Sequence, residues 1–139
     1  MQSLPLKLAL VTTTALALTL ALAGCATIKS VTDTPVQGDY PTWADVANST
    51  TPTALPPAFV PHDATNMYVR ASTLSSAEII TYTSKTPPDA TLCKPGTLTG
   101  APTLDTTWWP NTKPPATGEL CSPGWRLFTV AGETYGWRN

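Results

Sequence analysis

Proline is the feature that most limits what this chain can fold into. All but one of the 15 prolines follow residue 24, and they recur along the rest of the chain. Proline lacks an amide N–H and clashes with the preceding turn of a helix, so this distribution leaves no room for long helices. All five tryptophans lie in the same part of the sequence. We therefore predict a turn-rich structure around a compact aromatic core.

Four segments have the patterns of β-strands. Residues 67–72 alternate apolar and polar side chains, and residues 78–83 are rich in β-branched and aromatic side chains. Residues 125–130 and 134–138 flank Ala131-Gly132, a tight-turn signal. We expect two hairpins that join in one antiparallel sheet.

Two short segments carry signals for a single helical turn. Thr42-Trp43-Ala44-Asp45 has the spacing of a capping box, which would pin Trp43 against the domain. Thr86-Pro87-Pro88-Asp89 places a threonine N-cap before a proline at the first helical position. Neither pattern predicts a longer helix.

The N-terminal segment has the layout of a secretory signal. One lysine, Lys7, precedes an uncharged stretch from Leu8 to Ala23. This stretch is about 16 residues long, less than the roughly 20 needed to span a bilayer. It ends in Leu22-Ala23-Gly24-Cys25, which resembles the lipobox of bacterial lipoproteins.

The resemblance implies that residues 1–24 are a signal peptide and that Cys25 becomes the N-terminus, carrying a diacylglyceryl group. Two acyl chains anchor a protein stably, whereas one does so only marginally. The implied partner is membrane lipid, and the implied location is the outer face of the cytoplasmic membrane. Ordinary secretion, with Cys25 as a leftover thiol, is the alternative.

The other two cysteines begin the same four-residue sequence pattern, C-x-P-G: Cys93-Lys94-Pro95-Gly96 and Cys121-Ser122-Pro123-Gly124. Each occurrence predicts a type II turn that begins at the cysteine. If lipid occupies Cys25, Cys93 and Cys121 form the natural disulfide pair in an oxidising compartment. That disulfide would close a loop of about 29 residues and contribute about 3.5 kcal/mol to the free energy of unfolding.

A metal or redox site does not fit these cysteines, because C-x-x-C is missing and the single histidine, His62, is remote in sequence. We predict no metal and no cofactor.

These features give a fold class and a domain layout. We expect a mainly β protein, or an α+β variant of it. It would have a small antiparallel sheet of about four strands, one or two single-turn helices, Pro-rich loops and one disulfide. Residues 25–57, rich in Thr, Ser and Pro, would be a flexible tether, and residues 58–139 the folded domain. The Trp108-Trp109-Pro110 segment and the closing Tyr135-Gly136-Trp137 are similar to those of uncharacterised small lipoproteins of high-GC Gram-positive bacteria.

Charge and motif content exclude several functions. The chain has 8 basic and 9 acidic residues, so it lacks the excess of basic residues with which proteins bind the phosphates of nucleic acid. His62 and Asp63 are adjacent, and neighbours in a strand or turn seldom aim at each other, so they make a poor catalytic pair. We assign no catalytic residue.

Exposed aromatic side chains are the remaining candidates for function. Trp108, Trp109 and Tyr68 could stack on a sugar ring or anchor a protein partner. One of the adjacent tryptophans would cap the core while the other meets solvent. We predict a monomeric, non-catalytic recognition module for an envelope glycan or a membrane protein. A spacer that occludes an envelope or phage-entry component is the first alternative, and a small envelope hydrolase the second.

Overall fold

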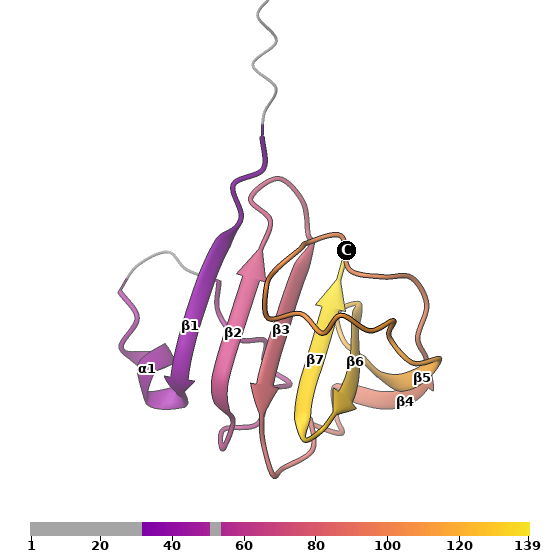
Figure 1. The fold of residues 1–139 in the computed structure, drawn as a ribbon. Coiled ribbons are helices and arrows are strands. Elements are labelled where there is room, and N and C mark those ends of the chain that lie inside the picture. The colour runs from indigo at the N-terminus through magenta and orange to yellow at the C-terminus, as the bar shows by residue number, and fades with distance from the viewer. Residues whose placement is uncertain (1–31, 51–53) are drawn as a thin grey trace, which may run out of the picture. The chain divides into compact units, whose positions relative to one another are not determined.

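Seven strands form one open antiparallel sheet in the computed structural model, which describes residues 32–50 and 54–139. The strand order is β1-β2-β3-β7-β6-β5-β4, so β1 and β4 are the two edges (Figure 1). The strands are listed here with the helix: β1 Val36–Thr42, α1 Trp43–Ala47, β2 Thr65–Ala71, β3 Glu78–Thr83, β4 Cys93–Thr97, β5 Thr117–Cys121, β6 Trp125–Val130 and β7 Glu133–Arg138. The predicted mainly β fold with one disulfide is confirmed, with more strands than the four expected.

The four predicted strands are β2, β3, β6 and β7, and they are contiguous in the sheet. β6 and β7 are joined by Ala131 and Gly132, whose φ angles of 51° and 84° are both positive. Positive φ at both central residues is the requirement of a type I′ hairpin turn. The central hairpin therefore forms where the sequence predicts it.

The chain is already folded in a region that we expected to be tether. β1 pairs with β2 from Val36 opposite Ala71 to Thr42 opposite Thr65. Tyr40 is 4% exposed and donates a hydrogen bond from its hydroxyl to the Ala54 carbonyl oxygen (2.9 Å). Gly38 lies so close to Ala54 that a Cβ would stand 2.2 Å from that same oxygen. The folded part thus begins before residue 58, at which we expected it to start.

Helix α1 follows β1 directly and contains the predicted helical turn. The Asp45 carboxylate accepts a hydrogen bond from the Thr42 amide (2.8 Å), which is one of the two bonds of a capping box, and it also accepts one from the Thr42 hydroxyl (2.7 Å). Trp43 donates its indole N–H to the Pro61 carbonyl oxygen and stacks on His62, with the ring centres 4.7 Å apart. Trp43 is pinned to the domain as predicted.

Two other local predictions were wrong. Pro95 and Gly96 lie within strand β4 rather than in a type II turn, because an edge strand tolerates a missing N–H. The segment that begins at Cys121 does form a turn, but its Ser122–Pro123 peptide is cis, and Gly124 has a φ of 75°. No helix forms at residues 86–89. Instead the Asp89 carbonyl oxygen accepts the amides of Leu92 and Cys93, one turn later in the chain.

Both faces of the sheet are buried, each by a different part of the chain. On the first face, Met67, Ile80 and Leu127 pack with Phe59 and Val60 from the segment between α1 and β2. The second face has a smaller aromatic cluster: Ile79, Leu98, Phe128, Tyr135 and Trp137. Figure 1 shows the β4–β5 connection, residues 98–116, running across β3 and β7 on this face. This connection carries Trp108 and Trp109.

Candidate binding groove

The two adjacent tryptophans have different roles in the structure. Trp109 packs edge-on against three rings of the second face, with centre distances of 5.9 Å to Phe128, 5.7 Å to Tyr135 and 6.2 Å to Trp137. Its amide also donates to the Thr106 hydroxyl (3.1 Å), which fixes the backbone of the connection. Trp109 therefore caps the aromatic cluster.

Trp108 lies beside Tyr68 of β2, a residue 40 positions earlier in the chain. The two ring centres are 6.3 Å apart and the ring planes are tilted by 32°. Both side chains are partly exposed. The structure thus places Tyr68 and Trp108 side by side, while Trp109, which is also partly exposed, makes the larger number of ring contacts with the core cluster.

A groove of about 370 Å³ runs along Trp108 between the connection and the outer strands. Gln37 of β1 and Arg70 of β2 supply one side, and Asp105, Thr106 and Thr107 supply the other. Arg70 follows Tyr68 by two positions on the same strand, so both side chains lie on the second face. The connection covers the centre of this face and leaves its β1–β2 margin to form the groove.

Two nitrogen atoms at this groove lack a hydrogen-bond partner among the described residues. They are the indole Nε1 of Trp108 and the guanidinium Nε of Arg70, and both are shielded from solvent. Arg70 also makes no salt bridge there, whereas Arg138 is paired with Glu78 at 2.7 Å. Unsatisfied donors are uncommon in native proteins. Tyr82 Oη and Trp137 Nε1 are in the same state away from the groove, so the two nitrogen atoms do not by themselves identify a ligand.

Sequence reasoning identified Tyr68 and Trp108 but missed Gln37, Arg70 and Asp105. The position of Arg70 on the same strand face as Tyr68 was a usable signal, because side chains two apart on a strand point to the same side. No local signal places Gln37 or Asp105 beside them. Their approach depends on strand β1, which was not predicted, and on the path of the connection.

A larger hollow of about 510 Å³ lies near the disulfide, next to Leu92, Leu120 and Trp125. Its tryptophan is only 2% exposed, so the hollow presents no aromatic face for stacking. Its charged lining residues, Lys94 and Arg126, are both cationic, and it has no amide or carboxylate side chain of the kind found beside Trp108. We therefore place the candidate site at the smaller groove.

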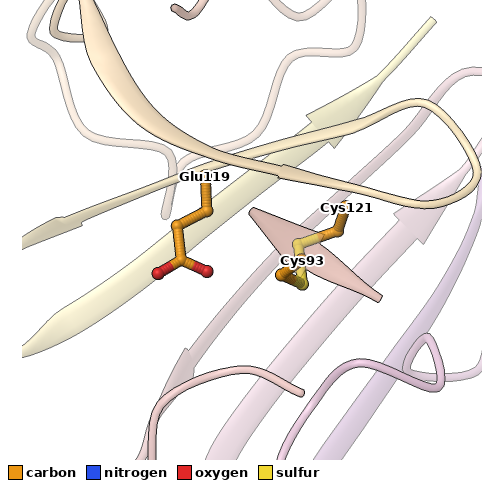
Figure 2. A group of neighbouring side chains, drawn as sticks. All are labelled: Cys93, Glu119 and Cys121. Carbon is orange, nitrogen blue, oxygen red and sulfur yellow. A yellow bond between two sulfur atoms is a disulfide. The ribbon is translucent and has the colours of Figure 1, made fainter. Parts of the chain in front are cut away.

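Cys93 and Cys121 form the predicted disulfide and lie directly opposite each other on β4 and β5. Figure 2 shows the Glu119 carboxylate beside them, and one oxygen and both sulfur atoms lie within 4.8 Å of one another. A metal would need deprotonated thiolates. Because the two sulfur atoms are bonded to each other, this trio offers only one carboxylate as a ligand.

Several titratable groups of the domain are engaged in structural contacts. Glu133 accepts hydrogen bonds from the hydroxyls of Thr81 (2.9 Å) and Tyr135, and burial, reinforced by Glu133, raises the pKa of Tyr135 to about 12. Burial raises the pKa of Glu78, although its partner Arg138 acts in the opposite direction.

His62 and Asp63 contact different parts of the domain. His62 stacks on Trp43. The Asp63 carboxylate accepts hydrogen bonds from the Ser84 hydroxyl (2.7 Å) and the Lys85 amide (3.1 Å), and the bond from Ser84 is the main cause of its lowered pKa.

The predicted lipidation site, Cys25, and the predicted signal peptide, residues 1–24, lie outside the described residues. Within residues 32–50 and 54–139, no helix has the length and apolar character needed to cross a bilayer. Comparison with protein-family models, curated proteins and solved structures gave no match to this chain.

Proposed function

We propose that this protein is a lipid-anchored recognition module on the outer face of the cytoplasmic membrane, and that it binds an envelope saccharide without catalysing a reaction. The lipobox-like sequence ending at Cys25 supports the anchor. The groove beside Trp108 supports the ligand class. The two parts of the proposal are tested separately.

The observation that carries the ligand class is the pairing of Tyr68 with Trp108 at the edge of a groove lined by Gln37, Arg70 and Asp105. Saccharides combine apolar C–H faces with a high density of hydroxyl groups. An exposed aromatic face suits the first, and amide, guanidinium and carboxylate groups suit the second. A volume of about 370 Å³ lies within the range of small-ligand sites, which begins near 300 Å³.

A saccharide fits the charge of the groove better than a strongly ionic ligand does. Arg70 and Asp105 line the same groove with opposite charges. A polyanion would be attracted by the first and repelled by the second, and a polycation the reverse. Hydroxyl groups donate to the carboxylate and accept from the guanidinium, so a neutral saccharide uses both.

The test is a binding titration with soluble fragments of envelope glycan. Binding is measured by calorimetry, so that no fluorescent reporter is needed. Trp108→Ala removes the stacking face and should weaken binding about 30-fold, as expected for an aromatic hot spot worth about 2 kcal/mol. Trp43→Ala is the matched control, because Trp43 is also partly exposed but belongs to α1 and stacks on His62.

Equal affinities of the Trp108→Ala and wild-type proteins would refute the groove as the binding site. If the wild-type protein binds no fragment of the envelope glycan, the saccharide proposal fails, and the spacer hypothesis becomes the better account. A spacer needs only bulk and an anchor, so its effect would survive Trp108→Ala and be lost with Cys25→Ser.

A further inference from the structure

The β2–β3 turn presents a single apolar side chain to solvent at one end of the sheet. Leu74 is 54% exposed. The turn around it is held by hydrogen bonds: the Ser72 amide donates to the Ala77 carbonyl oxygen (2.8 Å), and the Ser72 hydroxyl accepts the amides of Leu74 (3.0 Å) and Ser75 (2.9 Å). Leu74 is therefore exposed on a turn whose backbone conformation is fixed by these hydrogen bonds.

The first described residues of the chain are fastened to this same turn. The Asp33 carboxylate accepts hydrogen bonds from the Ser72 hydroxyl (2.6 Å), the Thr73 amide (3.0 Å) and the Thr73 hydroxyl (3.0 Å). The Ser72 bond is the main cause of the lowered pKa of Asp33. The carboxylate therefore remains ionised, and the bonds persist, at neutral pH. In Figure 1 the chain enters the sheet next to the β2–β3 turn.

This fastening limits how far the turn can lie from the proposed lipid anchor. Cys25 precedes Asp33 by eight positions in the sequence. A fully extended chain of that length spans at most about 28 Å. The β6–β7 turn is at the other end of the sheet, a strand length of about 20 Å from the β2–β3 turn.

The turn is chemically suited to lipid contact. Residues 72–77 read Ser-Thr-Leu-Ser-Ser-Ala and contain no charged side chain. Two charged groups lie beside the turn: the Asp33 carboxylate is held by Ser72 and Thr73, and Glu78 is paired with Arg138. Small hydroxyl side chains around one leucine can remain in the headgroup layer while the leucine reaches the acyl boundary.

We propose that the β2–β3 turn is a membrane-contact site, in which Leu74 inserts at the boundary between lipid headgroups and acyl chains. This inference rests on the lipid anchor of the proposed function but not on its saccharide ligand. The diacylglyceryl group keeps the turn near the bilayer, so that a contact too weak to recruit a free protein becomes an intramolecular event. The sheet then stands on the membrane with the β2–β3 turn toward it.

The test uses the full, natively lipidated protein in phosphatidylcholine nanodiscs, with and without a lipid that carries a paramagnetic headgroup. Intact mass first establishes that the preparation carries the diacylglyceryl group. Amide NMR signals of residues 73–76 should broaden at least three times more than those of residues 131–132, which form the β6–β7 turn. Leu74→Ser should remove most of this difference. Val130→Ser is the matched control, because Val130 is 44% exposed beside the far turn.

Equal broadening at the two turns in the wild-type protein would overturn the inference, because it would mean that the anchored domain has no preferred orientation. A Leu74→Ser protein that keeps the full difference would also overturn it. A mass without the lipid would remove this inference together with the proposed anchor, whereas the calorimetric test of Trp108 would be unaffected. Saccharide binding that persists in Leu74→Ser while the broadening is lost would separate the two sites.

Discussion

Replacing each of the adjacent tryptophans with alanine tests the division of the aromatic residues into core and site. Trp109 contacts three rings in edge-on geometry, and Trp108 contacts two rings in tilted geometry. Removing a core tryptophan typically costs about 3–5 kcal/mol, part of which is the roughly 0.5–1.5 kcal/mol of each aromatic pair. Because Trp109 is partly exposed, we place Trp109→Ala at the lower end, about 3 kcal/mol.

Trp108→Ala should cost less, about 1–1.5 kcal/mol, because its two ring contacts account for most of the loss. The free energy of unfolding is measured by urea denaturation. Unfolding is monitored by far-UV circular dichroism, so that the signal does not depend on tryptophan. The difference of about 1.5–2 kcal/mol corresponds to roughly 6–8 °C in melting temperature for a domain of this size. Equal losses, or a larger loss for Trp108→Ala, would refute the assignment of Trp109 to the core and Trp108 to the groove.

Four further predictions concern the disulfide, a buried carboxyl, the first strand and the anchor. Reduction of Cys93–Cys121 should lower the free energy of unfolding by about 3.5 kcal/mol, and an unchanged urea midpoint under reductant would contradict this. Burial raises the pKa of Glu78 in the folded state, so the unfolded state loses that proton first. Stability should therefore fall as the pH rises from about 4.3 through the raised pKa, and Glu78→Gln should abolish that slope. Gly38→Ala should destabilise the domain by at least about 1–3 kcal/mol, since a Cβ would meet the Ala54 carbonyl oxygen at 2.2 Å, whereas a tether residue would tolerate the change. Cys25→Ser should move the protein to the soluble fraction or leave its signal peptide uncleaved, and normal processing with membrane retention would count against lipidation.

The centre of the sheet was predictable because its strands carry their own signals. β2 alternates from Met67 onward, β3 is rich in β-branched residues, and Ala131-Gly132 marks the hairpin between β6 and β7. The edge strands were missed for a physical reason. Both edge strands contain proline and glycine, which have low strand propensity: Gly38 and Pro41 in β1, and Pro95 and Gly96 in β4. An edge strand pairs on one side only, so it accepts them.

The site was predictable only where one residue is informative by itself. Tyr68 and Trp108 are large aromatics, and their type alone made them candidates. Gln37 and Asp105 become groove residues only because strand β1 pairs with β2 and the β4–β5 connection crosses the second face. Pairings over such sequence distances depend on the whole fold, and local pattern does not encode them.

The disulfide makes residues 93–121 a closed covalent ring that includes Trp108, Trp109 and the whole β4–β5 connection. A secreted or surface-held protein meets proteases, and exposed loops are the preferred sites of cleavage. If a protease cut one peptide bond between Leu98 and Ala116, the two pieces would still be joined through Cys93 and Cys121. The nicked molecule would gain only the mass of one water, and its two pieces would separate on a gel only after reduction.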